Sequence, residues 1–342
     1  MKLFREFLME DDLENHRLTA QFNLGESGGK ARTVRDLLTG SLVDTKEACE
    51  IFLETKLCDS PNWGRSDLRE CIAKLHPGAT KDNVLITTGT SEALLLLFKV
   101  LKPKSVALPM PAFQLLYEIP EALNAQIIPL PIRWCENGAP WIDEDEWINI
   151  LQTKQPTCVL INNPQNPSGL VFTDSFLEKI DHICRAQKAT LIGDEHYRFL
   201  SHDKNILGTT IYKPTDEYNS FVTGSFIKCT GSPGLRIGWC VGPKQILSIM
   251  QNEKNYTTHT VNPLTEWISF EVLKNLLSPL WQEVRSEWLQ NKRVLESFLK
   301  ESQYFYGIAP QGGLVTCVGL KNIRTTAELQ NTHQTLLKNG IF

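Results

Sequence analysis

Two basic side chains, Lys228 and Arg236, stand eight residues apart in one short segment of the sequence. Lys228 lies between an apolar run and a glycine-rich turn, where loss of hydration lowers the pKa of an amine and makes it a nucleophile and a base. Arg236 is planar and permanently charged, which suits a phosphate group. The pair therefore indicates amine chemistry beside a bound phosphate.

Two further features that follow apolar runs could belong to the same site. Gly89-Thr90-Ser91 is a glycine turn that opens a helix, with Ser91 as the expected N-cap and Glu92 in the first turn. Backbone N–H groups at such a turn bind anions. After the next run comes the aromatic ring of Phe113. Taken alone, these features also fit an ordinary helix start and a core phenylalanine.

Two polar motifs are more specific. Residues 163–169 contain two Asn-Pro pairs and end in glycine, and each proline holds its preceding asparagine extended, so Asn166 is expected to direct its amide into a crevice. Residues 193–197 place Asp194 and Tyr197 three positions apart after another apolar run. An aspartate at the end of a buried strand is unfavourable unless a cation pairs with it, and a protonated ring nitrogen would serve.

Seven short apolar runs must position these side chains. They are nearly continuous in hydrophobicity and alternate with helical segments, which predicts a doubly wound sheet covered by helices on both faces. Such sheets bind ligands at the carboxyl ends of their strands, where the motifs stand. The predicted strands are residues 84–88, 105–108, 126–132, 158–162, 190–193, 221–225 and 236–241.

Helical periodicity appears between the strands and dominates after residue 243. The apolar positions of the last long helix include Trp281, Val284, Trp288, Val294 and Phe298. We expect an α/β protein with a large domain over residues 50–243 and a smaller α/β domain built from residues 1–49 and 244–342. Helices are predicted over 91–101, 174–187 with an acid, Asp174, as its cap, 244–255, 263–277 and 278–303.

Composition and charge exclude several classes of protein. The 342 residues are 42% hydrophobic and carry a formal net charge of −4, which offers no basic field for nucleic acid. The 9 cysteines form no C-x-x-C pair and the 7 histidines no helical pair, so neither a disulfide framework nor a metal site is expected. No apolar run is long enough to span a membrane and the acidic start is unlike a leader, so we expect a cytoplasmic protein.

Taken together, the motifs resemble the pyridoxal-phosphate enzymes of aminotransferase fold type I, over roughly residues 60–320. The resemblance implies a three-layer large domain with a seven-stranded, mostly parallel sheet, and pyridoxal 5'-phosphate (PLP) as the cofactor. A cationic pyridine ring is an electron sink for a substrate carbanion, and a nearby amine can shuttle the proton. The implied catalytic residues are Lys228, which binds the aldehyde of the cofactor, Asp194, which pairs with the ring nitrogen, and Tyr197.

The same resemblance assigns the remaining contacts to the cofactor. Asn166 and Tyr197 are implied to hydrogen-bond the ring hydroxyl, and Phe113 to stack on the ring face. The implied phosphate ligands are Gly89, Thr90, Ser91, Ser225 and Arg236.

Three departures from a standard aminotransferase bear on the reaction. Ile227 stands where the family has a second small hydroxylated residue, and residues 62–69 lack the tyrosine that reaches the phosphate of the neighbouring subunit. The sequence also ends at Phe342, before the C-terminal arginine that usually holds the substrate carboxylate. We therefore expect either that another group holds the carboxylate or that the given sequence is incomplete.

Residues 18–32 and 194–199 resemble a narrower, arginine-modifying branch that includes capreomycidine synthase, PLP-dependent arginine oxidases and the hydroxyarginine cyclases that form enduracididine. Lys30 and Phe22 replace a histidine and an acid of the oxidases, which favours the cyclases. We expect a hydroxylated arginine to lose its side-chain hydroxyl and its guanidine then to close a ring. Glu26, Thr19 and Asn166 are candidate substrate contacts, although an exposed N-terminal arm explains the first two equally well.

Other functions remain open. An amino-acid aminotransferase would need a keto-acid co-substrate, and an arginine oxidase would need oxygen. A cofactor-binding regulator would need a DNA-binding module, for which the first fifty residues have neither the length nor a basic helix. The expected partners are an amino acid and a second copy of the chain, with Thr260 and Asn262 reaching across the subunit boundary, rather than nucleic acid or a membrane.

Overall fold

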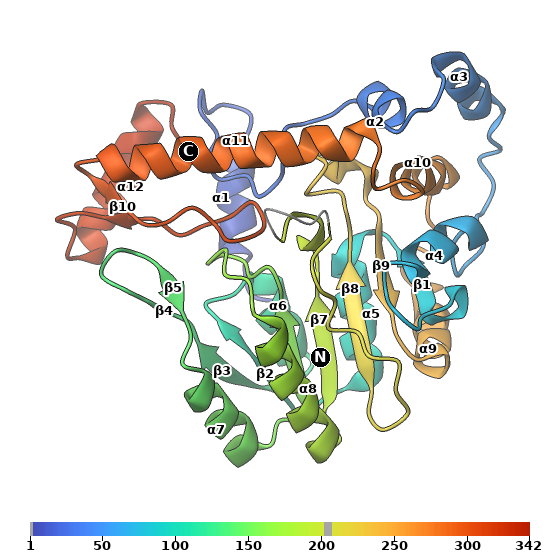
Figure 1. Ribbon diagram of the computed structural model, residues 1–342, viewed down its shortest axis with the longest axis horizontal. Coiled ribbons are helices and arrows are strands. Elements are labelled where there is room, and N and C mark those ends of the chain that lie inside the picture. The colour runs from blue at the N-terminus through green and yellow to red at the C-terminus, as the bar shows by residue number, and fades with distance from the viewer. Residues whose placement is uncertain (1–2, 202–206) are drawn as a thin grey trace.

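The computed structural model describes residues 3–201 and 207–342, and its centre is a seven-stranded sheet of order β1-β9-β8-β7-β6-β2-β3 (Figure 1). Every strand is parallel to its neighbours except β9, which is antiparallel to β1 and β8. The seven predicted strands and the mostly parallel sheet are thus confirmed. The strands are β1 (Val84–Thr87), β2 (Ser105–Met110), β3 (Gln126–Pro131), β6 (Cys158–Asn162), β7 (Thr190–Asp194), β8 (Ser220–Gly224) and β9 (Gly238–Val241).

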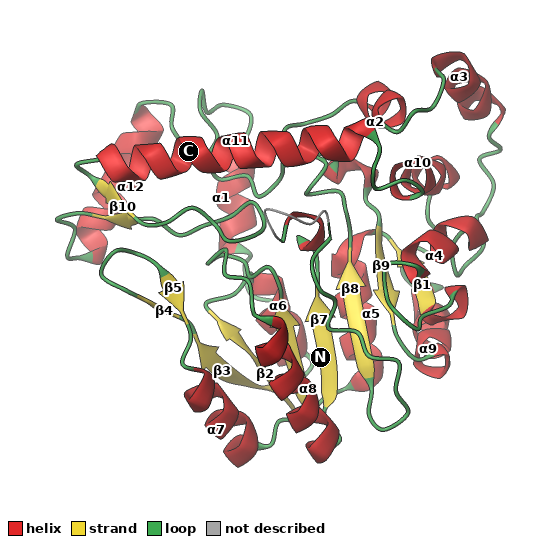
Figure 2. Ribbon diagram, in the orientation of Figure 1, coloured by secondary structure: helices red, strands yellow, loops and turns green. Residues whose placement is uncertain are grey.

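Helices cover both faces of this sheet, so the centre of the molecule has three layers (Figure 2). On one face Leu85, Leu160 and Phe221 pack with α5 (Gly89–Leu101), α6 (Gln114–Ala122) and α9 (Lys244–Lys254). Neighbouring strand residues point to the other face, toward α7 (Glu144–Lys154) and α8 (Asp174–Gln187). Burial on both faces explains why the strands are almost entirely apolar.

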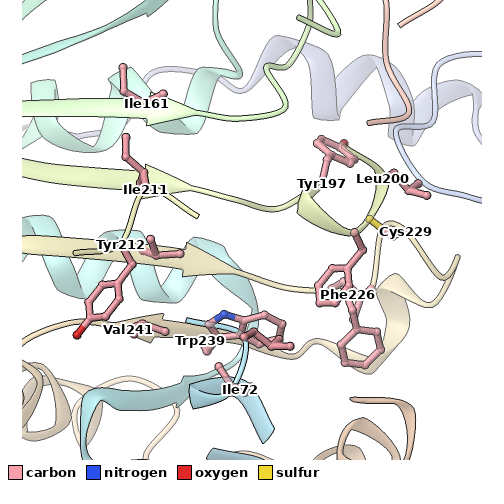
Figure 3. Close-up of a cluster of buried hydrophobic side chains, with 14 of the residues drawn as sticks. Ile72, Ile161, Tyr197, Leu200, Ile211, Tyr212, Phe226, Cys229, Trp239 and Val241 are labelled. Atoms are coloured by element: carbon pink, nitrogen blue, oxygen red, sulfur yellow. The ribbon is translucent and has the colours of Figure 1, made fainter. Parts of the chain in front are cut away.

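The second of these clusters reaches the carboxyl ends of the strands. Figure 3 shows it extending from Ile161 and Val241 to Phe226, Cys229 and Tyr197. Strand β9 runs against its neighbours, so its first residues lie at the edge where the parallel strands end. All the motifs that follow β1, β2, β6, β7 and β8, together with the segment before β9, therefore meet at one edge.

The C-terminal end of the chain lies beyond this edge of the sheet (Figure 1). Helix α11 (Pro279–Glu301) contacts α2 (Val34–Gly40), and Phe22 forms a β-bridge with Ile341. No helix among the described residues is both long and apolar enough to cross a bilayer. The other elements here and beside the sheet are α1 (Leu8–His16), α3 (Thr45–Glu54), α4 (Ser66–Ala73), α10 (Pro263–Leu273), α12 (Thr326–Lys338), β4 (Arg133–Trp134), β5 (Pro140–Trp141), β10 (Phe305–Tyr306) and β11 (Gly319–Leu320).

Two predicted helix caps are wrong. Helix α5 begins at Gly89, so Ser91 lies within its first turn, and Thr88 at the N-cap makes no side-chain cap bond. Helix α8 is capped by Thr173, whose hydroxyl accepts from the Phe176 N–H, whereas Asp174 is already helical. The N-cap lies three residues earlier than expected in α5 and one residue earlier in α8.

The apolar stripe predicted on the last long helix holds for only half of α11. Trp281, Val284 and Trp288 are buried, but Val294 is 63% exposed and Phe298 is 50% exposed. The first half of α11 packs on the core of the large sheet domain, and the second half extends past it (Figure 1). Periodicity identified the helix but not the length of its buried face.

Candidate active site

A cavity of about 600 Å³ opens at the carboxyl edge of the sheet. Residues from the ends of β1, β2, β6, β7 and β8, and from the segment before β9, meet residues of the N-terminal segment in its wall. Most of the residues that the sequence singled out lie here, namely Glu26, Gly89, Thr90, Ser91, Phe113, Asn166, Asp194, Tyr197, Lys228 and Arg236. Four do not line the cavity: Thr19, Ser225, Thr260 and Asn262.

Asp194 is held rigidly at the end of β7. Sheet register sets it between Asn162 and Thr223, whose side chains both donate to its carboxylate: Asn162 Nδ2 to Oδ2 at 3.1 Å and Thr223 Oγ1 to Oδ1 at 3.2 Å. Burial raises the pKa of Asp194 from 3.8 to about 7, with the hydrogen bond from Thr223 acting against the shift. A cation facing this carboxylate would restore its ionised form.

Lys228 and Tyr197 share one partner in the N-terminal segment. Lys228 Nζ donates to Ser27 Oγ at 3.0 Å, and Tyr197 Oη donates to the carbonyl of Ser27, also at 3.0 Å. Burial lowers the pKa of Lys228, which favours the neutral amine, while the carboxylates of Glu26 and Glu10 act in the opposite direction. Burial also raises the pKa of Tyr197, so its hydroxyl keeps its proton.

The turn between β1 and α5 is closely packed against the arginine before β9. Gly89 has φ +80°, and a Cβ there would lie 2.9 Å from Nη2 of Arg236. A Cβ on Gly238 would lie 2.5 Å from the carbonyl carbon of Gly89. Glycine at both positions therefore lets the guanidinium group reach the first turn of α5, and the arrangement offers N–H groups, two hydroxyls and a guanidinium to an anion.

Thr19 and Ser225 make other contacts. Thr19 is exposed and donates to the carbonyl of His16 at 3.3 Å. Ser225 is fully buried and donates to the carbonyl of Ile237 at 2.7 Å. Their expected contacts with substrate and phosphate remain predictions that this arrangement does not favour.

Several residues of the cavity were missed in the sequence. Asn162 could have been found, because it ends a predicted strand beside the one that carries Asp194. Ser27, Glu10 and Arg17 gave no local signal, because they come from a segment about two hundred positions before Lys228 and meet it only through the fold. His196 was visible in the motif around Asp194 but was given no role.

The donor set fits a phosphorylated pyridine aldehyde. Asp194 is a buried carboxylate that lacks a cation, and Lys228 is a buried amine with a lowered pKa. The glycine turn and Arg236 provide a cradle for a phosphate at the other side of the cavity. These are the complements of a pyridinium N–H, an aldehyde and a phosphate group, respectively.

Fold and site together define a PLP-dependent enzyme with the fold type I architecture. The aminotransferase class I and II family matches residues 48–342, and the chain belongs to this family. PLP is accordingly its cofactor.

Individual relatives include both a synthase and aminotransferases. The chain is 30% identical to capreomycidine synthase from Streptomyces vinaceus over 318 residues, which cover 90% of this chain and 77% of that protein. It is 25% identical to an aspartate aminotransferase from Pyrococcus horikoshii over 252 residues, or 70% of this chain and 62% of that protein. The matched part thus spans less than two thirds of that aminotransferase.

Solved structures show the same fold. A PLP-dependent aminotransferase from Streptococcus suis superposes with a TM-score of 0.85 at 22% identity, covering 99% of this chain and 88% of that one. The PLP-dependent cyclase OrfR also superposes with a TM-score of 0.85, at 21% identity, covering 100% of this chain and 89% of that one. The shared fold accommodates more than one reaction, so the reaction must be argued from the cavity.

Proposed function

We propose that the chain is a cyclase that acts on a hydroxylated L-arginine. It removes the side-chain hydroxyl as water, and the guanidine of the substrate then closes a ring, giving a cyclic guanidino amino acid such as L-enduracididine. The observation that carries this proposal is an acidic patch of the cavity wall, formed by Glu10 and Glu26 on the Lys228 side of the site.

This patch already contacts one guanidinium group, that of Arg17. Arg17 Nη2 lies 3.5 Å from Glu10 Oε2, and its Nε lies 3.7 Å from both Glu26 Oε1 and Glu14 Oε2. These distances are long, and Nε has no hydrogen-bond partner among the described residues. Three carboxylates around one guanidinium leave an excess of negative charge, which a second guanidinium, that of the substrate, would reduce.

The chain's own residues supply the proton transfers. Bound PLP provides an electron sink for the substrate carbon. Lys228, as a buried amine of lowered pKa, can accept a proton from the α-carbon and pass it on, and Ser27 fixes the position of its Nζ. Glu10 and Leu13 of helix α1, and Phe7 at its N-cap, form one wall of the cavity beside these groups.

Ring closure follows from how the substrate is held. If Glu10 and Glu26 bind the guanidine near the carbon that loses its hydroxyl, the attack is intramolecular and benefits from a high effective concentration. A hydroxyl on Cγ gives a five-membered ring and one on Cβ a six-membered ring. The product is the substrate less one water, so neither an oxidant nor a second substrate is needed.

The relatives support the proposal in part. The resemblance to capreomycidine synthase and to a PLP-dependent cyclase agrees with cyclisation. The matches to aminotransferases keep transamination as the second candidate. Transamination would return a keto acid and would depend on a keto-acid co-substrate.

Mass spectrometry of reaction mixtures separates the candidates. The enzyme loaded with PLP is incubated with arginine, γ-hydroxyarginine and β-hydroxyarginine, and Lys228→Ala is the matched control. Loss of one water from a hydroxyarginine, without oxygen uptake, is expected. A keto acid formed only with a co-substrate would indicate transamination, oxygen uptake would indicate an oxidase, and no turnover of any guanidino amino acid would remove the arginine assignment.

A further inference from the structure

His196 lies in the cavity wall two positions after Asp194, beyond the end of β7. Its Nδ1 is 3.2 Å from Oγ1 of Thr90, which belongs to the glycine turn at the start of α5. Its Nε2 is shielded from solvent and has no hydrogen-bond partner among the described residues. One ring nitrogen therefore contacts a candidate phosphate ligand, and the other is buried without a hydrogen-bond partner among the described residues.

The surroundings keep this imidazole neutral. Burial is the main cause that lowers the pKa of His196 to about 3, and the positive charges of Lys228 and Arg236 act in the same direction. A neutral imidazole has one N–H donor and one acceptor nitrogen. In one tautomer Nδ1 carries the proton and donates to Thr90 Oγ1. In the other tautomer Nδ1 accepts a hydrogen bond from the Thr90 hydroxyl, so the two tautomers orient this hydroxyl differently.

The orientation of the Thr90 hydroxyl is important because few hydroxyl groups near the phosphate cradle are available to the phosphate. Ser225 donates its hydroxyl proton to the carbonyl of Ile237, and Ile227 has no hydroxyl to offer. Thr90 and Ser91 are the hydroxyl groups that remain in this part of the described cavity wall. If Nδ1 accepted from Thr90, that hydroxyl proton would point away from an anion in the cradle.

We propose that His196 is a positioning residue for the phosphate of the cofactor. Its Nδ1–H donates to Thr90 Oγ1 and thereby directs the Thr90 hydroxyl proton to the phosphate. Histidine at this position compensates for the hydrogen bonds that Ser225 and Ile227 do not supply. The inference depends on PLP binding alone, so it stands whether the reaction is cyclisation or transamination.

A double-mutant cycle on PLP affinity tests the proposal without any assay of activity. His196→Leu removes the donor and keeps much of the volume, and Thr90→Val removes the hydroxyl. Each is expected to weaken PLP binding by about tenfold, the loss of one hydrogen bond to a charged group. Their effects are expected not to add, so that His196→Leu changes little in the Thr90→Val background. His196→Asn, which can present an N–H near the Nδ1 position, is the matched control and is expected to stay within a few-fold of the native affinity.

Two results would overturn the proposal. PLP affinity unchanged in His196→Leu would show that the imidazole has no role in the phosphate site. Equal weakening by His196→Leu in both backgrounds would show that the imidazole acts without Thr90.

A spectroscopic measurement on the native sequence covers the case in which His196→Leu does not fold. Nitrogen-15 NMR of ring-labelled histidine in the PLP-loaded protein reports the tautomer, with His196→Asn used to assign the signal. The proton is expected on Nδ1 and unchanged across neutral pH, because the imidazole does not titrate there. A proton on Nε2, or an imidazolium at neutral pH, would refute the assignment.

Discussion

At the scale of single residues, the site contains two ionisable groups whose charged forms are unfavourable until a ligand binds beside them. Among the described residues, the Asp194 carboxylate accepts hydrogen bonds from two neutral side chains and pairs with no cation, and the Lys228 amine donates to one hydroxyl. Both groups are desolvated, and desolvation disfavours the charged form of each. The cofactor supplies what both lack, so its binding and the folding of the chain should be linked.

Asp194→Asn is expected to change how the cofactor-free protein responds to pH. The folded-state pKa of Asp194 is raised from 3.8 to about 7, so between these values the folded state holds a proton that the unfolded state has lost. Its contribution to stability is full below pH 4 and is lost as pH rises toward 7, by about 1 kcal/mol per pH unit. Denaturant unfolding from pH 5 to 7 should show this loss in the native chain and not in Asp194→Asn. Equal slopes in both would contradict the assignment, and native protein loaded with PLP should lack the slope.

Glu10→Gln and Glu26→Gln test the acidic patch by charge alone. Each is expected to raise KM for γ-hydroxyarginine by about tenfold, the value of one charged hydrogen bond. The two carboxylates raise the pKa of Lys228, so their removal lowers it further and should shift the acidic limb of the kcat–pH profile, where this base loses its proton, to lower pH. Glu14→Gln is the control, because Glu14 contacts Arg17 without lining the cavity. Equal effects in all three variants would point to Arg17 rather than to the substrate.

At the scale of elements, α1 forms a cover over the cavity, and the residues that precede it bind to α6. The backbone N–H and Nε of Arg5 donate to Glu118 at 2.8 and 2.6 Å, and Gln114 Nε2 donates to the carbonyl of Glu6 at 2.8 Å. The ring of Phe7 lies 5.4 Å from that of Phe113. The cover is thus attached to the same helix whose N-cap is the aromatic residue of the site.

Arg5→Ala is expected to loosen this cover without unfolding the chain. Hydrogen exchange of residues 8–16 should become several-fold faster, because Arg5 loses its part-buried ion pair with Glu118 and its exposed one with Glu121. The fold is kept because such pairs are individually weak. Arg185→Ala removes a comparable exposed arginine, which lies on α8 and pairs with Asp181 of that helix and with Glu217. If exchange in residues 8–16 is the same in both variants, Arg5 does not hold the cover.

Elements were predictable from the sequence to the extent that their signals are local. Continuous apolar runs predicted all seven strands, because every strand except the partly exposed β3 is buried on both faces. The sequence was sufficient to place three features at one edge of the sheet, because parallel strands end at the same edge. These features are the glycine turn at Gly89, Asp194 and Lys228. The contact of Ser27 with Lys228 could not, since it joins residues 201 positions apart and depends on how the N-terminal segment folds back.

At the scale of the whole molecule, the phosphate turn is tied to a segment that the resemblance places at a subunit boundary. Glu92, in the first turn of α5, accepts from the backbone N–H of Thr88 at 2.7 Å and from the hydroxyl of Thr258 at 2.8 Å. Thr260 follows and donates to Asp59 at 3.2 Å. If a second copy of the chain displaced this segment, Glu92 and the phosphate turn would therefore move with it.

Complementation between two inactive variants tests whether the site is shared by two copies of the chain. Lys228→Ala removes the amine, and Thr260→Glu places a negative charge where the partner's phosphate is expected. If Thr260 of one copy faces the cofactor of the other, a mixed dimer has one site with both changes and one with neither. After co-refolding in equal amounts, half of the dimers are mixed, so activity should return to about a quarter of the native value. Light scattering should give the mass of two chains for each variant. Any of three results would refute a shared site: a mass of one chain, full activity of Thr260→Glu alone, or a mixture no more active than its components. Each of these results requires that Lys228 and its phosphate cradle be complete within a single copy.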